Sequence, residues 1–408
     1  MSTLLLPPAF KRLAWSNLAA QSAEQIGLAA APIIAVIGLG AGAGETGLLQ
    51  TAQTLPFLLL SFPAGMLADR TARRRLMAGA EALRTLSLIA ILALAGTGLL
   101  TLPLLALLGF VGATGTVAYT VAAPSLVPAL VPHAQLARAN GRIELARAVA
   151  FAAGPALAGA LIARLGAAPS FAVAAALSVA AVLLLAGIAE PARAPAPPRR
   201  LVQDLREGAG FAWNHELLRP ILLTAVFFNL AWFVLQAVYV PYAVHHLGLS
   251  AAEVGATLAT YGVGMVAGAL AAPLITQALP LGAVIAIGPL AGLSAALVMA
   301  ATLWAPSMAL ACTSFFLIGA GPILWVISST TLRQAVTPDA LLGRVSAIIT
   351  MATAGARPLG AAIGAAVGAG YGADACILVA VAGFVIQALV ILASPVARLA
   401  ALPARSAA

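Results

Sequence analysis

The sequence predicts an all-α membrane protein whose twelve transmembrane helices form two six-helix bundles related by a pseudo-two-fold axis. Three observations support this fold class: few charges, long apolar runs, and a repeat between the two halves of the chain. Charged residues make up 8% of the 408 residues, against about a quarter in soluble domains. The apolar runs are rich in Ala, Leu and Gly and do not alternate with polar residues, which favours helices over a membrane β-barrel.

Twelve apolar segments follow one another along the chain. Each is long enough to cross a hydrocarbon core of about 30 Å as a helix, and a helix satisfies its own backbone hydrogen bonds inside lipid. The expected spans are 14–40, 45–66, 76–97, 101–123, 141–163, 168–189, 219–244, 251–275, 281–303, 306–329, 344–368 and 374–395.

A linker at 191–218 is expected to join an N-terminal bundle at 1–190 to a C-terminal bundle at 219–408. Four prolines between 191 and 198 cannot continue a helix and favour an extended chain. Apolar residues then recur at helical spacing over 201–212. This pattern is typical of an interfacial amphipathic helix, although a solvated linker with some helix remains the alternative.

Basic residues gather on one side of the predicted membrane protein. The net charge is +9, and only Arg164 falls on the opposite side. This is the positive-inside pattern, which predicts a multi-pass protein of the bacterial inner membrane with both termini in the cytoplasm. The basic excess therefore indicates orientation, and we expect no nucleic-acid partner. The basic residues assigned to the cytoplasmic side are Lys11, Arg12, Arg70, Arg73, Arg74, Arg75, Arg138, Arg142, Arg193, Arg199, Arg200, Arg206, Arg219, Arg333, Arg344, Arg398 and Arg405.

The two halves of the chain share a repeated pattern. Pro132 and Arg138 recur as Pro338 and Arg344, both at a spacing of 206 residues. Two halves of similar orientation are therefore expected, and parallel repeats of this kind place a substrate site near the membrane midplane between them.

Four segments resemble the major facilitator superfamily (MFS) of transporters. They are the loop Gly65–Arg75, the segment Leu136–Gly141, the stretch Leu205–Gly208, and Leu332–Arg344. Together with twelve spans and the repeat, they are similar to the bacterial branch that contains the enterobactin exporter and macrolide efflux permeases. The resemblance implies the MFS fold over essentially the whole chain, alternating access, and a cavity lined by spans 1, 4, 7 and 10.

The loop between spans 2 and 3 is the predicted cytoplasmic gate. Gly65 has no side chain and allows close helix packing, and Asp69 suits a neighbouring helix N-terminus. By resemblance, this loop gates the two halves, with Arg70, Arg73 and Arg74 holding the interface through ion pairs. The alternative is that these arginines only set the topology.

Glu24 and Arg357 are the charges that we expect deepest in the membrane. Glu24 lies 12 residues after Arg12, and Arg357 lies 13 residues after Arg344. At about 1.5 Å per residue, these are depths of about 18 and 20 Å, near the centre of the core. A carboxylate there is costly unless it is protonated or paired, which suits a proton carrier. We therefore assign proton coupling to Glu24 and Arg357.

Alternative roles remain for both residues. Glu24 and Arg357 are expected to meet across the central cavity, or Arg357 binds an anionic group of the substrate; Glu24 could instead be a structural, hydrogen-bonded carboxylate. No second acid is expected inside the membrane, because Glu81 is interpreted as a local i, i+3 partner of Arg84 near the cytoplasmic end.

Polar and aromatic residues on four spans are the predicted substrate cavity. Asn17 and Gln21 share one helix face with Glu24. Such a mixed face suits a small amphipathic solute, whereas the alternative is helix–helix packing with interfacial aromatic residues. The remaining candidates are Asn229, Trp232, Gln236 and Tyr239 on span 7, Tyr119 on span 4 and Trp325 on span 10.

Span 5 resembles the Gly-x-x-x-Gly-Pro-x-x-Gly-Gly motif of MFS antiporters. Gly154, Pro155 and Gly159 match it, while Ala150 and Ala158 replace two glycines. Small residues and a proline predict a closely packed, kinked helix. Span 4 lacks the arginine that drug antiporters of the superfamily often carry, so their proton-relay scheme is not expected here.

The prediction is a secondary active transporter that exports a small amphipathic compound (a drug, siderophore or metabolite) in exchange for protons. Uptake of a nutrient by proton symport and a non-transporting membrane receptor are the alternatives. No enzymatic activity, cofactor or metal site is expected, and the partners are the substrate, protons and the lipid bilayer. The protein is expected to be a monomer.

Overall fold

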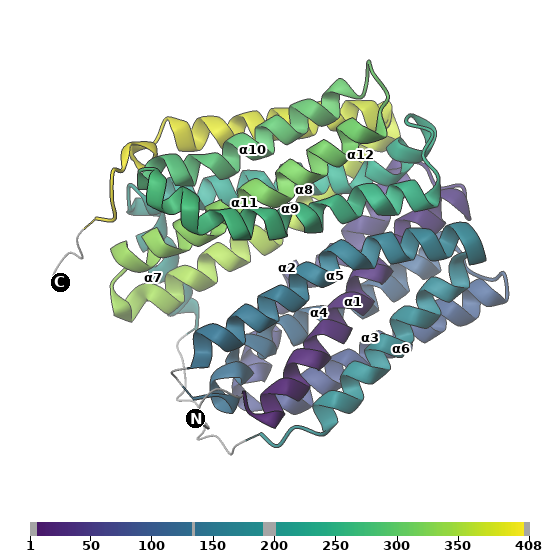
Figure 1. Ribbon diagram of the computed structural model, residues 1–408, viewed down its shortest axis with the longest axis horizontal. Coiled ribbons are helices and arrows are strands. Elements are labelled where there is room, and N and C mark those ends of the chain that lie inside the picture. Colours follow the sequence, from purple (N-terminus) through teal and green to yellow (C-terminus); the bar gives the residue numbers. More distant parts are fainter. Residues whose placement is uncertain (1–5, 133–134, 191–200, 404–408) are drawn as a thin grey trace.

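The computed structural model describes residues 6–132, 135–190 and 201–403, and these residues form helices without any strand. The helices group into two bundles (Figure 1). The first bundle consists of α1 (Pro8–Ile37), α2 (Ala43–Arg70), α3 (Arg73–Gly96), α4 (Leu102–Leu130), α5 (Leu136–Leu165) and α6 (Ala167–Ala186). The second consists of α8 (Leu218–His245), α9 (Ala251–Ala278), α10 (Leu281–Ala301), α11 (Met308–Val336) and α12 (Asp339–Leu392), followed by the short 3-10 helix η3 (Pro395–Arg398).

The described residues hold twelve membrane-length helices, as predicted, although the last two are continuous. Eleven helical stretches are long and apolar enough to cross a membrane, and the last of them runs from Leu341 to Leu392. Within it, Gly372 has φ 81° and ψ 177°, so two helices meet there. Only glycine adopts this conformation readily, which explains why the predicted spans 344–368 and 374–395 have so short a connection.

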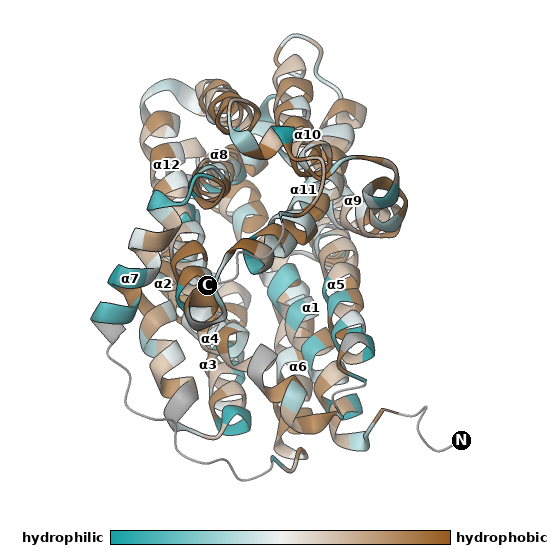
Figure 2. Ribbon diagram, turned by 90° about the vertical axis from the view of Figure 1, so that its left-hand side faces the viewer, coloured by the Kyte–Doolittle hydropathy of each residue, from teal (hydrophilic) through white to brown (hydrophobic). Residues whose placement is uncertain are grey.

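The outer surface of both bundles is apolar. Large hydrophobic side chains are exposed along the helices, with Leu270 and Leu274 of α9 more than 70% accessible. Figure 2 shows hydrophobic residues over most helices and a hydrophilic stretch on α7 (Leu201–Asn214). An exposed apolar belt of this size would aggregate in water and is stable in lipid.

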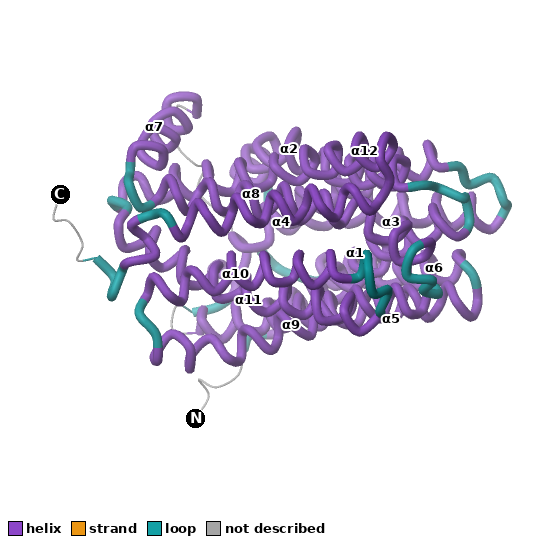
Figure 3. The backbone as a smooth tube through the Cα atoms, turned by 90° about the horizontal axis from the view of Figure 1, so that it is seen from above, coloured by secondary structure: helices purple, strands orange, loops and turns teal. Residues whose placement is uncertain are grey.

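The two bundles meet closely at the end of the molecule that is far from the termini. Both described chain ends lie at one end, called here the termini end (Figure 3). At the opposite, far end, α2 packs on α12 and α5 packs on α9. A Cβ atom at Gly47 would lie 2.4 Å from the Cα atom of Ala365, so this approach requires glycine. The bundles diverge toward the termini end (Figure 1).

The helix α7 connects to the second bundle at the termini end. Arg344 of α12 pairs with Asp204 of α7 at 2.8 Å and also with Glu207. The residues predicted to form an amphipathic helix are therefore helical and are held by ion pairs. Residues 191–200 lie outside the described residues, so the predicted division at 1–190, 191–218 and 219–408 stays a prediction.

Candidate functional site

A cavity of about 370 Å³ lies between the two bundles. This volume falls within the range of about 300–1,000 Å³ that small-molecule sites occupy. Glu24 of α1 and Arg84 of α3 line it from the first bundle, and Trp232 of α8, Tyr261 of α9 and Arg357 of α12 line it from the second. The cavity therefore takes its wall from both bundles, as expected for a transporter with a central site.

Arg84 is the centre of a buried charge cluster in the first bundle. Its guanidinium donates to both carboxylate oxygens of Glu81, at 2.6 and 2.5 Å. It also lies 3.4 Å from Oε2 of Glu24 and donates to the carbonyl oxygen of Ala20 at 2.8 Å. A forked arginine–carboxylate pair is strong and directional, so Glu81 fixes the orientation of Arg84.

Hydroxyl groups complete the environment of Glu81. Ser178 of α6 donates to Oε1 of Glu81 at 2.6 Å, and Thr85 donates to Ser178 at 2.8 Å. The Glu81 side chain is 1% exposed, against 18% for Glu24. Glu81 is therefore enclosed and fully partnered, whereas Glu24 faces the cavity with one long contact.

The prediction that Glu81 and Arg84 lie near the cytoplasmic end of their helix is wrong. The predicted local pair exists, but it is buried, and Glu81 is a second acid inside the membrane-spanning region. Arg84 lies 11 residues after Arg73, which is about 17 Å along a helix. The depth calculation that selected Glu24 would also have selected Arg84.

Arg357 enters the cavity from the second bundle between two aromatic rings. Its guanidinium carbon lies 5.2 Å from the ring centre of Phe57 and 5.7 Å from that of Phe233. Both distances fit cation–π contacts. The predicted ion pair with Glu24 is absent in this conformation. Among the described residues Glu24 pairs with Arg84 instead, although Glu24 and Arg357 line the same cavity.

The second bundle supplies an aromatic and amide wall. The ring of Trp232 stacks on Tyr261, with centroids 5.5 Å apart and an interplanar angle of 18°. Asn229 and Gln236 line the cavity on the same helix as Trp232. Three residues of the face predicted on span 7 therefore line the cavity: Asn229, Trp232 and Gln236. Tyr261 and Phe57 were not predicted.

Five predicted cavity residues lie away from the wall of this cavity. Tyr239 is fully buried, and its hydroxyl bonds to Thr257 of α9 at 2.5 Å. Tyr119 is 3% exposed within the core of the first bundle. Helical periodicity gives the direction of a side chain but not the neighbour that fills that space. The other three are Asn17 and Gln21, closer than Glu24 to the termini end of α1, and Trp325, which packs against α10.

The predicted gate makes its described contacts within the first bundle. The carboxylate of Glu190 accepts from the backbone N–H groups of Arg73 and Arg74, at 3.0 and 2.9 Å. A carboxylate at a helix N-terminus is favoured by the helix dipole. The guanidinium of Arg74 also donates to the carbonyl oxygen of Ala186 at 2.9 Å.

Of the remaining gate residues, the structure describes the surroundings of Gly65, which lie within the first bundle. A Cβ atom at Gly65 would meet only Val121 of α4, at 3.9 Å. The side chains of Asp69 and Arg70 lie outside the described residues. The predicted role of the gate loop between the bundles therefore stays a prediction.

The motif on span 5 allows α5 to approach two other helices. A Cβ atom at Gly154 would lie 2.5 Å from that of Gln25 on α1, and one at Gly159 would lie 2.9 Å from the Cα atom of Gly255 on α9. A Cβ atom at Gly255 would in turn lie 2.5 Å from the carbonyl oxygen of Pro155. These small residues let α5 contact α1 in its own bundle and α9 in the other one.

Comparison with known proteins identifies the family. The model of the transmembrane secretion effector family, within the MFS, matches residues 9–407. The chain belongs to this family. This MFS transporter is 27% identical over 364 residues to the multidrug efflux pump Tap of Mycobacterium tuberculosis (strain ATCC 25618 / H37Rv), covering 86% of the transporter and 85% of Tap.

Solved structures support the fold of this MFS transporter. The nucleoside transporter NupG superposes with a TM-score of 0.73 at 12% identity, covering 95% of the transporter and 98% of NupG. A bacterial homologue of the iron transporter ferroportin in the inward-facing state gives 0.73 at 16% identity, covering 94% and 98%. The predicted MFS fold is confirmed, and family membership makes the chain a multi-pass membrane transporter and not an enzyme.

Proposed function

We propose that the protein exports a small amphipathic compound from a bacterial cell in exchange for protons. The observation that carries this proposal is the position of Glu24. Its carboxylate lines the cavity between the bundles, and among the described residues its one hydrogen-bond partner is Arg84, at 3.4 Å. Such a group can exchange a proton without dismantling the cluster below it, because Glu81 continues to neutralise Arg84. The similarity to the Tap multidrug efflux pump supports export of a drug-like compound.

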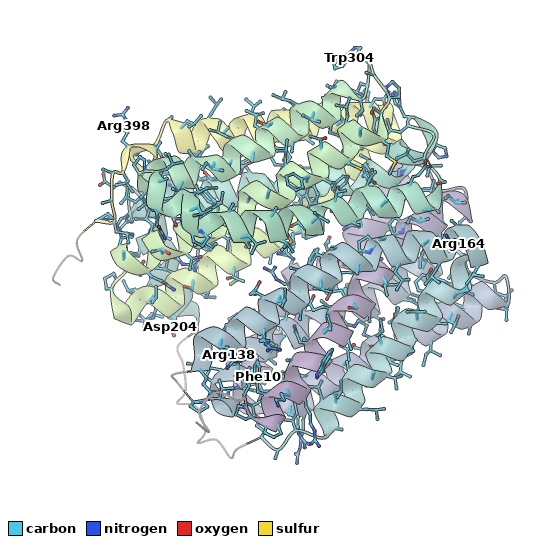
Figure 4. The ribbon with its side chains drawn as sticks, in the orientation of Figure 1. Phe10, Arg138, Arg164, Asp204, Trp304 and Arg398 are labelled. Atoms are coloured by element: carbon cyan, nitrogen blue, oxygen red, sulfur yellow. The ribbon has the colours of Figure 1, made fainter. Side chains whose placement is uncertain are left out.

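The proposed orientation puts the termini end in the cytoplasm of an inner membrane. Arg138, Asp204 and Arg398 lie at this end, and Arg164 lies at the far end (Figure 4). An excess of arginine on one side is the usual cytoplasmic signal. With this orientation the bundles diverge toward the cytoplasm, so the described conformation would receive substrate from inside the cell. We expect a monomer to be sufficient, because each chain contains both walls of the cavity.

The proposed cycle alternates a proton and the substrate. In the outward-open state Glu24 would take a proton from the more acidic exterior, and the neutral residue would release its ligand. After the return to the inward-open state, Glu24 would lose that proton to the cytoplasm and bind again. Arg84, Arg147 and Arg357 line the cavity with Glu24; Glu81 pairs with Arg84, and Glu144 pairs with Arg147. Since Arg84 and Glu81 compensate each other, the state of Glu24 sets the net charge at the cavity wall.

Proton movement in everted membrane vesicles tests this proposal. Vesicles with an acidic interior are challenged with a panel of amphipathic drugs and siderophore-like compounds. We expect a compound to raise the interior pH through wild-type protein and not through Glu24→Gln. Glu207→Gln is the matched control, because Glu207 also pairs with an arginine, Arg344, but lies outside the cavity.

Three results would contradict the proposal. Alkalinisation that survives Glu24→Gln would keep antiport and remove Glu24 from its centre. Transport of a compound only when the gradient is reversed would replace export by proton symport for uptake. A non-transporting receptor predicts no flux in either direction and no effect of Glu24→Gln.

A further inference from the structure

Two opposite charges face the central cavity from opposite bundles. Among the described residues, Glu24 has one long ion pair of 3.4 Å with Arg84, and Arg357 has none. Glu24 belongs to α1 and Arg357 to α12, and both lie on the cavity wall. They share this cavity, yet no ion pair within 4.0 Å joins them in the part of the chain that the structure describes. Two charges that are not paired with each other cost free energy in a low-dielectric site, unless a ligand supplies a charge of opposite sign to each of them.

The guanidinium of Arg357 has unused hydrogen-bonding capacity. Its Nε atom is buried without a hydrogen-bond partner, and across the described residues its side chain makes no hydrogen bond. The rings of Phe57 and Phe233 hold the group in place by cation–π contacts. Arginine presents a planar fork of donors that matches a carboxylate. This site is therefore suited to an acidic group of a ligand.

Glu24 has unused capacity of the opposite kind. In the described ranges its carboxylate makes one hydrogen bond, the 3.4 Å contact with Arg84. Arg84 is already engaged by Glu81 at 2.5 Å, so it neutralises Glu24 poorly. A carboxylate has about four acceptor positions, and Glu24 is 18% exposed to the cavity. It can therefore accept an ammonium group.

The other charges on the cavity wall are compensated. Arg84 is paired with Glu81, and Arg147 is paired with Glu144 at 2.6 Å. One charge of each sign is left over, on Glu24 and Arg357. A ligand with a single charge would pair with one of these two groups and leave the other without a counter-charge.

We infer that the transporter binds zwitterionic aromatic amphiphiles, with their acidic group on Arg357 and their ammonium group on Glu24. The aromatic body would lie against the stacked rings of Trp232 and Tyr261, which line the same cavity. This inference rests on the proposed function for its transport step. It also fits that function, because a substrate ammonium group and a proton compete for the same carboxylate. A ligand that bridges α1 and α12 would draw the two bundles together.

Equilibrium binding to the full-length protein in lipid nanodiscs tests this inference. The probes share a naphthalene ring: naphthylalanine and aminomethylnaphthoate are zwitterions, naphthylpropionate is an acid and naphthylethylamine is an amine. We expect at least one zwitterion to bind about 10- to 100-fold more tightly than either singly charged probe, as for one additional charge-assisted hydrogen-bonded pair.

Single substitutions assign each charge to its residue. Arg357→Met should remove the advantage of the zwitterion over the amine, and Glu24→Gln should remove its advantage over the acid. Arg333→Met is the matched control, because the Nε of Arg333 is also buried without a hydrogen-bond partner but the residue lies outside the cavity. If Arg357→Met does not fold, Arg357→Lys keeps the charge and should keep a reduced preference for the zwitterion.

Equal binding of all probes to wild-type protein would overturn the inference without any variant. An equal loss of affinity for all probes in Arg357→Met would also overturn it. The binding measurement needs no gradient, so its outcome is separate from that of the vesicle experiment. Drug-induced alkalinisation without a zwitterion preference would reject the substrate class and keep the proposed exporter. A zwitterion preference without any alkalinisation would keep the site and reject proton-coupled export.

Discussion

The two bundles treat their buried charges in different ways. In the first bundle, Arg84 and Glu81 form a closed cluster with hydroxyl groups around it, and Glu24 stands at its edge. Arg357 of the second bundle has no ion pair among the described residues and lies between the rings of Phe57 and Phe233. The closed cluster is a structural element, whereas the two residues at the cavity wall are open to a proton or a ligand. The candidate transport residues Glu24 and Arg357 thus differ from the cluster of Arg84 and Glu81 in their incomplete ion pairing more than in their burial.

Removing the buried carboxylate of the closed cluster should have the largest effect on stability. Glu81→Ala leaves Arg84 without its main partner inside the bundle, which costs about 3–5 kcal/mol for a buried pair. We expect a strong loss of folded protein, measured by thermal unfolding in detergent and fluorescence-detected gel filtration. Glu144→Ala, in the exposed pair, should change stability little. Wild-type stability of Glu81→Ala would show that the cluster is not structural.

Weakening the contact between the two bundles at the far end should have the next largest effect on the protein. A Cβ atom at Gly47 would lie 2.4 Å from Ala365, and overpacking of this kind costs about 1–3 kcal/mol. This is enough to shift the conformational equilibrium about 5- to 150-fold. Gly47→Val should increase hydrogen–deuterium exchange at the start of α2 and reduce transport. Gly79→Val, where added atoms have open space, is the control; equal exchange in both variants would reject the role of the contact.

Glu24→Gln should separate function from stability. The residue makes one 3.4 Å contact, so we expect a loss of unfolding free energy of about 1 kcal/mol or less. The same variant is expected to lose proton-coupled transport. Thermal unfolding of the variant beside wild type tests this contrast with Glu81. A destabilisation as large as that of Glu81→Ala would place Glu24 in the closed cluster.

Arg344→Ala should have the smallest effect. Its ion pairs with Asp204 and Glu207 fasten α7 to α12, but all three side chains are partly exposed. Solvent screening limits their contribution to about 1 kcal/mol at most. In Arg344→Ala we expect faster hydrogen exchange that is confined to α7. The control variant Arg219→Ala should leave the exchange rate of α7 unchanged. Exchange at the wild-type rate in Arg344→Ala would mean that apolar packing alone holds the helix.

Much of the architecture could be predicted because lipid imposes simple rules on a sequence. Length and hydropathy located the helices, and the predicted spans 344–368 and 374–395 are separated by a short connection that contains Gly372. The depth calculation selected Glu24 and Arg357, which line one cavity. For Tyr239, the periodicity of α8 gave a face but not its neighbour, and Thr257 of α9 is the partner.

The sequence by itself determined the spans, their repeat and the similar depth of Glu24 and Arg357, since these follow from the repeated pattern, the rise per residue and the thickness of the bilayer. Only the tertiary structure decided which charges are paired. Arg84 was assigned to a local pair, yet it also contacts Glu24 on α1, 60 residues away along the chain. Depth is a property of one helix, whereas pairing depends on how several helices are rotated and packed against each other.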